Sequence, residues 1–293
     1  MNARKSAAII AAAMVLISAN PASAQVNPFV TTVFALSPTH DYVAEWTQSG
    51  SRWTVIGPGA NHLYVGAPGV FTAQIPGGDG IEEYQGNPNQ WTLIGGPGAA
   101  FAVGGNNVYG LGPTNNYVAE WNGPGQGWTE IGGPAGQIYA GEAGVFVTDP
   151  TNTTLYHYDG TPGQWTAIGS ARGDFAVGVS TIYSVPADNN PQDAVEAWTG
   201  SGSAWTSLGG SAAAIWAGGT GLYLTDEGSG DIEKYSGTPG HWTVIGGPGT
   251  QFVSSDTNLY GLGPNGSYVG LWSGQGQTWS QIGGPAWGLA AGS

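Results

Sequence analysis

The chain has no cysteine and few charged residues. Only 8% of its 293 residues are charged, and five basic side chains stand against 19 acidic ones. Without disulfides, a buried core alone must hold the fold together in an oxidising compartment. The acidic balance is unfavourable for binding nucleic acid or anionic membranes, so we expect neither as a partner.

Glycine, in contrast, is abundant at 53 residues, and together with the low charge it suggests a low-complexity or disordered chain. The aromatic content argues against disorder, because disordered chains are poor in aromatic residues. This chain has 13 Trp and 13 Tyr. We therefore expect a folded domain.

The first 24 residues form a predicted signal peptide. Arg4 and Lys5 precede an apolar stretch at residues 7–17, and residues 22–24 give a small-x-small pattern before Gln25. No later stretch approaches the roughly 20 apolar residues needed to cross a bilayer, so we expect no membrane insertion. Residues 25–293 are predicted to be one exported domain, periplasmic or extracellular. Its three basic and 19 acidic residues give a net charge of −16.

A short motif, Trp-Ser/Thr-x-Ile/Leu-Gly, recurs seven times at intervals of 37 to 40 residues. Another aromatic residue stands seven positions before each motif tryptophan. Because every unit carries the motif tryptophan, we predict that it packs between neighbouring units. The seven motif tryptophans, which define units 1 to 7, are Trp53, Trp91, Trp128, Trp165, Trp205, Trp242 and Trp279.

Each unit holds four short apolar runs separated by Gly, Pro, Asn or Ser. In unit 3 these runs are residues 101–103, 108–111, 117–121 and 128–131. Runs of this length without a helical period predict β-strands joined by tight turns, and hence an all-β chain. Four-stranded units repeating at nearly 40 residues are typical of the blades of a β-propeller.

The two ends of the chain complete one unit between them. The N-terminal part of the domain supplies runs two to four, at residues 33–36, 42–46 and 53–56, and lacks a first run. Residues 286–292 have the pattern of a first run with nothing after it. Pairing of these segments would remove exposed sheet edges. The sequence therefore predicts a seven-bladed β-propeller of short four-stranded blades, closed by its C-terminal strand.

A second period alternates along the repeat. The aromatic residue of the third run is Trp in units 1, 3, 5 and 7, which we term Trp-type, and Tyr in units 2, 4 and 6, which we term Tyr-type. These residues are Trp46, Trp121, Trp198 and Trp272 in the first group and Tyr84, Tyr158 and Tyr235 in the second.

Candidate ligand-binding residues follow this alternation. The first run of each Tyr-type unit carries a large aromatic residue, Tyr64, Tyr139 or Trp216, where Trp-type units have Ala or Val. These three residues are predicted platforms on which a sugar ring can stack. The alternative is volume compensation, in which a smaller aromatic in the third run leaves room for a larger one in the first.

Polar residues directly before the motif tryptophan follow the same alternation. Tyr-type units carry Gln90, Gln164 and His241 there, and Trp-type units carry other residue types. Amide and imidazole groups can recognise sugar hydroxyls, so we include these three as candidates. The alternative is that they are ordinary polar turn residues.

The residues needed for catalysis or metal binding do not gather in the repeat. The four histidines fall at different repeat positions, which predicts no metal site and no cofactor. Arg52, Arg172 and Lys234 are likewise at unrelated positions, so an axial cluster of the kind used by propeller hydrolases is not expected. The sequence favours a protein that is not an enzyme, and a propeller lyase or hydrolase is the weakest alternative.

The repeat resembles those of the tectonin and tachylectin-type β-propellers. The resemblance rests on Trp-x-x-Ile-Gly-Gly-Pro, a following apolar strand that ends in Gly, and an apolar-aromatic pair such as Val108-Tyr109 or Leu259-Tyr260, and it spans residues 30 to 292. It implies a lectin-like propeller that recognises glycans or bacterial surface polysaccharide, in pockets between blades or on one face. The seven copies and the alternation depart from that family, so no pocket position can be transferred.

We therefore predict a secreted, multivalent carbohydrate-binding propeller whose partner is a carbohydrate or cell-surface glycan. The alternative is a non-catalytic adhesion scaffold that binds a protein partner.

Overall fold

The computed structural model describes residues 31–73, 80–105, 107–171, 173–185 and 194–292. Within these ranges the chain forms 27 β-strands and one 3₁₀ turn, η2 (Pro264–Gly266). The predicted all-β class is confirmed. The predicted signal peptide, residues 1–24, lies outside the described residues.

The strands form antiparallel sheets that follow the sequence units. Units 1 to 4 contain β1 (Val33–Leu36), β2 (Tyr42–Trp46), β3 (Trp53–Pro58), β4 (His62–Gly66), β5 (Gly69–Ala73), β6 (Ile81–Tyr84), β7 (Trp91–Gly95), β8 (Ala100–Gly104), β9 (Asn107–Leu111), β10 (Val118–Trp121), β11 (Trp128–Gly132), β12 (Ile138–Gly141), β13 (Gly144–Thr148), β14 (Thr154–Tyr158) and β15 (Trp165–Ser170). Units 5 to 7 contain β16 (Asp174–Val177), β17 (Ile182–Val185), β18 (Ala194–Trp198), β19 (Trp205–Gly218), β20 (Gly221–Asp226), β21 (Asp231–Tyr235), β22 (Trp242–Pro248), β23 (Gln251–Ser254), β24 (Leu259–Leu262), β25 (Val269–Trp272) and β26 (Trp279–Gly283). The last strand is β27 (Gly288–Ala291).

Units 5 and 6 share one seven-stranded sheet because β19 runs through both. The sequence predicts two separate strands here, the last of unit 5 and the first of unit 6, and that prediction is wrong. The connection is Gly209-Gly210-Ser211, whereas Pro97 and Pro134 interrupt the corresponding connections into units 3 and 4. Proline removes a backbone N–H donor, so its absence permits a continuous strand. It does not require one, because the connection from unit 4 to unit 5 also lacks proline and β15 and β16 are separate strands.

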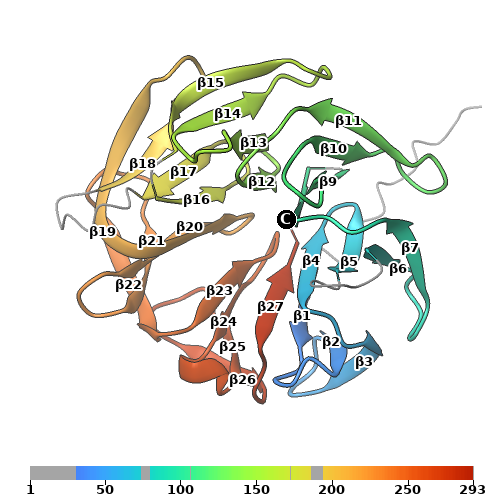
Figure 1. Cartoon of the computed structure of the whole chain (residues 1–293). Helices are drawn as coiled ribbons and strands as arrows, with labels where there is room; N and C mark the ends of the chain where they lie inside the picture. The colour runs from blue at the N-terminus through green and yellow to red at the C-terminus, as the bar shows by residue number, and fades with distance from the viewer. Residues whose placement is uncertain (1–30, 74–79, 106, 172, 186–193, 293) are drawn as a thin grey trace, which may run out of the picture.

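The sheets are arranged around a centre, with the first strand of each unit innermost and the fourth outermost (Figure 1). The inner strands contact one another in the cyclic order β27, β4, β8, β12, β16, β19, β23 and back to β27. The N-terminal strands therefore lie beside the C-terminal ones.

The two ends of the described chain meet in one sheet. β27 pairs antiparallel with β1, from Val33 opposite Ala291 to Leu36 opposite Gly288. The sheet order is β27-β1-β2-β3, which is the arrangement expected from the split unit.

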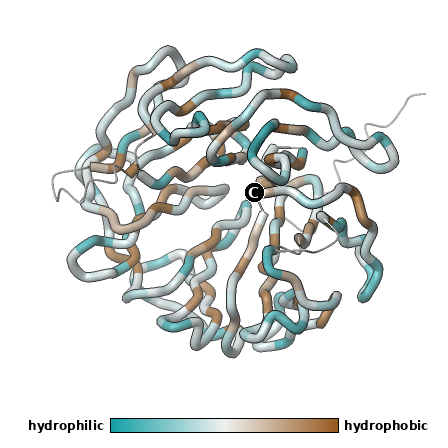
Figure 2. The backbone as a smooth tube through the Cα atoms, viewed as in Figure 1, coloured by the Kyte–Doolittle hydropathy of each residue, from teal (hydrophilic) through white to brown (hydrophobic). Residues whose placement is uncertain are grey.

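The core lies between neighbouring sheets. Each hydrophobic cluster combines buried side chains from two sequence-adjacent units, or from units 7 and 1. Phe71 of β5, for example, is fully buried and packs edge-on against Trp121 of the next unit, with ring centroids 5.9 Å apart. Figure 2 shows hydrophobic segments along the strands and many hydrophilic ones in the outer turns. The units therefore hold one another in place through shared burial.

The motif tryptophans add a hydrogen bond across every one of these boundaries. Each indole Nε1–H donates to a backbone carbonyl in the fourth strand of the preceding unit. The pairs are Trp53–Ile282, Trp91–Ile56, Trp128–Ile94, Trp165–Ile131, Trp205–Ile168, Trp242–Leu208 and Trp279–Ile245, at 2.7 to 3.2 Å. The prediction that these residues pack between units is confirmed.

The glycine that follows Ile in the motif makes room for this indole. A Cβ atom at Gly57 would lie 2.2 Å from Nε1 of Trp91, and one at Gly283 would lie 2.9 Å from Nε1 of Trp53. Contacts this short do not occur, so six of the seven motifs require glycine there, and in unit 5 the residue that meets the indole is the next one, Gly210. The tryptophan of one unit and the glycine of the preceding unit therefore pack against each other at each boundary.

Candidate functional site

The three predicted aromatic platforms lie at boundaries between sheets. Each is partly buried and packs edge-on against a phenylalanine in the first strand of the next unit. The ring centroids of Tyr64–Phe101, Tyr139–Phe175 and Trp216–Phe252 are 6.3, 5.3 and 5.2 Å apart. Burial raises the pKa of both Tyr64 and Tyr139 to about 12. These contacts favour a packing role, and their predicted ligand contact stays a prediction.

The three predicted polar residues lie elsewhere. Gln90, Gln164 and His241 are exposed, and their carbonyls close the outer turns before β7, β15 and β22 by accepting from Gln85, Asp159 and Ser236. In the sheet of unit 2, β5 and β6 lie between β4 and β7. At about 4.8 Å per strand, Tyr64 and Gln90 belong to strands roughly 14 Å apart. The structure therefore does not bring the two predicted sets together.

Three Trp-type units share a hollow that the repeat pattern did not reveal. In units 1, 3 and 7, two small residues face each other across the second and third strands. The pairs are Ala35–Ala44, Gly110–Ala119 and Gly261–Gly270. Because these positions carry a methyl group or no side chain, the face of the sheet is left open at the same place in each unit.

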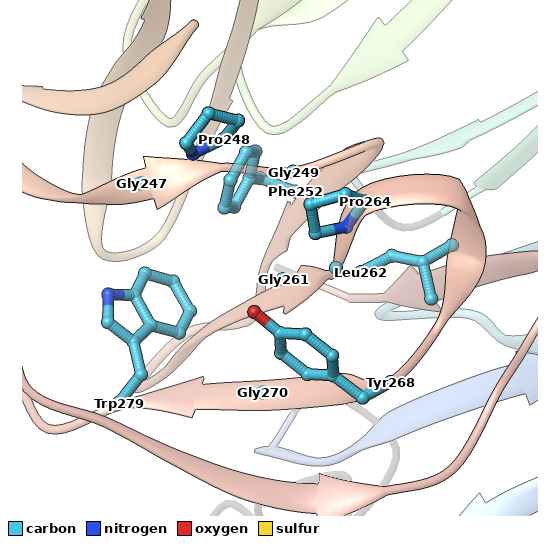
Figure 3. Close-up of a pocket in the computed structure, with 11 residues that line it drawn as sticks. Gly247, Pro248, Gly249, Phe252, Gly261, Leu262, Pro264, Tyr268, Gly270 and Trp279 are labelled. Atoms are coloured by element: carbon cyan, nitrogen blue, oxygen red, sulfur yellow. The ribbon is translucent and has the colours of Figure 1, made fainter.

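The hollow of unit 7 is walled by aromatic rings from two strands and a loop (Figure 3). Trp279 of β26 and Phe252 of β23 bound one side, and the phenol of Tyr268, in the loop directly before β25, points its hydroxyl toward the space between them and Pro264. The connection from unit 6, Gly247-Pro248-Gly249, forms the remaining wall. The cavity has a volume of about 320 Å³.

The hollows of units 1 and 3 have the same construction. In unit 1, Tyr42, Trp53 and the Gly284-Pro285 connection line a cavity of about 340 Å³. In unit 3, Tyr117 and Trp128 line one of about 170 Å³ together with Phe101 and the connection at residues 95–98. None of the residues that line these three hollows is charged.

One loop presents the tyrosine in all three units. Its sequence is Leu-Ser/Gly-Pro-x-x-x-Tyr-Val, at residues 36–43, 111–118 and 262–269. The residue after Leu donates its N–H to the tyrosine carbonyl in each case, at 3.0, 2.9 and 2.8 Å. A Cβ atom at Gly263 would lie 2.4 Å from the ring of Tyr268, and one at Gly112 would lie 2.6 Å from the ring of Tyr117, so in units 7 and 3 glycine lets the ring lie over the loop; unit 1 has Ser37 at this position. Within the described part of the chain, the hydroxyls of Tyr42, Tyr117 and Tyr268 make no hydrogen bond.

A related cavity of about 240 Å³ lies on unit 4, beside Tyr156 and Trp165. Its floor is not open in the same way, because the equivalent cross-strand pair is Val147–Tyr156. The shared construction of small floor residues and a loop tyrosine is therefore a property of units 1, 3 and 7.

The sequence did contain a signal for these hollows. The tyrosine stands four residues before the third-run tryptophan in units 1, 3 and 7, and Ala or Gly stands two residues before it. Unit 5 has Ala194 and Glu196 at these positions, so the signal does not follow the Trp-type alternation. The predicted candidates Tyr64, Tyr139 and Trp216 lie instead in the first strand of Tyr-type units.

No group of three or more His, Cys, Asp or Glu side chains suited to a metal ion occurs in the ranges that the structure describes. Over the same ranges, none of the helical structure has the length and apolar character required to cross a membrane.

Comparison with known proteins shows the fold and no family. No family model matches the chain. No curated protein matches its sequence. A functionally unknown protein from Desulfotomaculum acetoxidans is 11% identical with a TM-score of 0.57, over 89% of this chain and 99% of that one. Apo AztD from Citrobacter koseri is 11% identical with a TM-score of 0.52, over 88% and 97%.

The chain is similar to β-propeller proteins. At these identities the likeness concerns the fold alone. The tectonin and tachylectin-type resemblance is not among these similarities and stays a hypothesis based on the repeat motifs.

Proposed function

We propose that this chain is a secreted, non-catalytic β-propeller of seven blades that binds carbohydrate in the hollows of units 1, 3 and 7. The observation that carries the proposal is the threefold recurrence of one construction: a floor of small cross-strand residues, a motif tryptophan and a tyrosine with an available hydroxyl. A fold has no need to leave the same space open three times.

The number of blades and the closure of the ring are supported by three independent features. These are the β27–β1 pairing, the cyclic contacts of the inner strands, and the indole hydrogen bond of Trp53 to Ile282, which crosses from unit 1 to unit 7. Secretion is supported by the predicted signal peptide at residues 1–24.

The chemistry of the walls favours a neutral sugar. Aromatic faces and edges offer contact area to the C–H groups of a sugar ring, and the tyrosine hydroxyl can both donate and accept hydrogen bonds. The uncharged lining gives an ionic ligand no partner, and burying an unpaired charge is costly. The acidic surface of the whole protein also repels anionic ligands.

Three equivalent sites on one rigid body suit a repetitive ligand. A polysaccharide that reaches two hollows gains affinity through effective concentration without any new contact. We therefore expect weak binding of single sugars and much tighter binding of polymers or surfaces.

The experiment is a glycan array with two triple variants. The hollow variant carries Tyr42→Ala, Tyr117→Ala and Tyr268→Ala, and the inner-strand variant carries Tyr64→Ala, Tyr139→Ala and Trp216→Ala. Near-ultraviolet circular dichroism reports whether each remains folded, and Leu93→Ala, which removes an exposed apolar side chain from β7, is the matched control.

We expect the folded hollow variant to lose binding and Leu93→Ala to retain it. Loss of binding in a folded inner-strand variant, with binding retained by the hollow variant, would move the site to the residues first predicted from sequence. Absence of binding by the wild-type protein to every glycan would reject the proposed function.

A protein-binding scaffold is the second candidate, and exposed apolar side chains on two neighbouring outer strands favour it. Val55 of β3 and Leu93 of β7 are 50% and 54% exposed. A negative array, together with concentration-dependent self-association in sedimentation that Val55→Ser and Leu93→Ser abolish, would favour this alternative.

A further inference from the structure

Trp287 occupies a position at which other units have small or polar residues. The backbone position is defined by an N–H that donates to the carbonyl at the end of the second strand of the unit. The donor–acceptor pairs are Trp287–Leu36, Ala99–Leu111, Gly136–Thr148 and Thr250–Leu262. Since Ala, Gly and Thr fill the same position, the fold does not require an indole there.

The side chain of Trp287 is also unusually exposed. At 61% exposure it is the most exposed large hydrophobic residue of the described chain. Leaving this much apolar surface in water has no benefit for folding, because hydrophobic stabilisation scales with the area removed from water. An exposed aromatic ring that the fold does not need is a candidate ligand contact.

A histidine lies against this ring. The ring centroids of His40 and Trp287 are 4.6 Å apart, at an interplanar angle of 52°. Nδ1 of His40 lies 2.9 Å from the carbonyl oxygen of Ala60, so Nδ1 carries the proton. In the neutral imidazole, Nε2 is then an acceptor that can receive a hydrogen bond from a hydroxyl group.

A second histidine, His62, lies at the start of β4 in unit 2. His62 is exposed and lies nearly parallel to Tyr64, with ring centroids 6.2 Å apart. Burial, and then the nearby charge of His40, lower the pKa of His62, which favours its neutral form. Trp287 and His40, which we term the row, contact each other, whereas His62 contacts Tyr64 within β4.

This row adjoins the hollow of unit 1. Leu36, whose carbonyl accepts the N–H of Trp287, lines that hollow, as does Ala286, the neighbour of Trp287 in the chain. Tyr42 of the hollow and His40 of the row belong to the same loop. A chain molecule bound in the hollow therefore meets the row at its edge.

We propose that Trp287 and His40 form a subsite beside the hollow of unit 1 that holds a further residue of a neutral carbohydrate chain. The indole supplies a stacking face, and the imidazole of His40 supplies an acceptor for a hydroxyl group. The exposed carboxylate of Asp41, next to His40 in the loop, disfavours an anionic sugar. Unit 1 thereby differs from units 3 and 7, whose equivalent positions are Ala99 and Thr250.

This inference rests on the proposed function, and its test separates the two. The probes are cello-, xylo-, manno- and chito-oligosaccharides of one to six residues, and the method is isothermal titration calorimetry. The background variant is Tyr117→Ala with Tyr268→Ala, which leaves the hollow of unit 1 as the remaining hollow with its tyrosine.

In this background, we expect the hexasaccharide of the best-binding series to bind about tenfold more weakly after Trp287→Ala, which corresponds to about 1.4 kcal/mol. Binding of the monosaccharide stays unchanged, and the control Val179→Ala, which removes an exposed apolar side chain that lines none of the hollows, changes neither. The gain of affinity with chain length should thus disappear when the indole is removed.

Three outcomes overturn the subsite. Equal hexasaccharide affinity with and without Trp287 rejects it and leaves the proposed function standing. Equal losses for monosaccharide and hexasaccharide place Trp287 in the main site. Absence of binding by the wild-type protein to every probe rejects the subsite and the proposed function together.

Discussion

Units 6 and 7 are neighbours with the same backbone, yet one is filled where the other is open. On unit 7, Gly261 faces Gly270 across β24 and β25 and the hollow lies above them. On unit 6 the equivalent pair is Leu224 and Glu233, and Leu224 is fully buried in the core shared with unit 5. The same scaffold therefore produces a packed face or a cavity according to two side chains.

The two units share the contacts at their boundaries and differ in the side chains on the face of the sheet. Both units keep the motif tryptophan and its hydrogen bond, Trp242 to Leu208 and Trp279 to Ile245. Stability is thus supplied at the boundaries between units, which leaves the faces of individual sheets free to differ.

The largest expected effect comes from opening the filled unit. Leu224→Ala removes a fully buried side chain and leaves a cavity, so we expect a loss of about 2 to 5 kcal/mol in the free energy of unfolding. Urea denaturation measures the loss. Leu93→Ala, at an exposed position, should stay within about 0.5 kcal/mol of wild type. Equal effects of the two would contradict the difference between filled and open sheets.

Replacing a packed tyrosine and a hollow tyrosine by alanine should change the free energy of unfolding by different amounts. Tyr139 packs edge-on against Phe175, so Tyr139→Ala is expected to cost about 2 kcal/mol in urea denaturation. Tyr268 is 40% exposed at the rim of a hollow, and Tyr268→Ala should change stability by less than about 0.5 kcal/mol. A large loss for Tyr268→Ala would mean that its ring supports the fold.

The boundary hydrogen bonds should contribute alike in both units. Trp242→Phe and Trp279→Phe each remove one indole donor and leave a carbonyl without its partner, for a loss of about 1 kcal/mol. Their effects diverge in carbohydrate binding, which we expect only Trp279→Phe to weaken. Equal binding by both variants would exclude Trp279 from the site.

The smallest expected change in stability concerns the turn that stands in unit 4 where units 1, 3 and 7 have the tyrosine loop. In unit 4 the turn after β13 is closed by Asp149, whose carboxylate accepts from Thr151 Oγ1 and from the N–H groups of Thr153 and Thr154. These bonds, led by that of Thr151, hold the pKa of Asp149 below its usual range. The stabilisation is therefore present above the unfolded pKa of about 3.9 and is lost as the pH falls below it.

The measurement compares wild type with Asp149→Asn by urea denaturation. The gap between their midpoints should be widest at pH 7 and should narrow at pH 3, where Asp149 of the unfolded wild-type chain takes up a proton while the folded carboxylate stays ionised. A gap that is constant with pH would show that the charge of Asp149 does not matter to the turn.

The fold could be predicted from sequence because the residues that define it recur in every unit. Trp53 and its six equivalents, each paired with a glycine, mark every boundary and fix the period. The continuous β19 was not predicted, because no residue in the connection between units 5 and 6 marks it: this connection lacks proline, but so does the one between units 4 and 5, where the strands are separate.

The hollows were harder to predict because their floors are formed by residues with a small side chain or none. Gly261 and Gly270 form a floor only because the register of β24 and β25 places them opposite each other. The prediction instead followed the large residues Tyr64, Tyr139 and Trp216, whose contacts with Phe101, Phe175 and Phe252 could not be read from a single unit.

The pairing of β1 with β27 also determines when the molecule can be completed. Strand β1 is among the first segments to leave the ribosome and must wait, with one edge uncovered, for a partner made some 250 residues later. A chain cut short before Gly288 would keep that edge exposed and available to other chains. A chain that ends before β27 is therefore expected to aggregate more readily than the full-length chain.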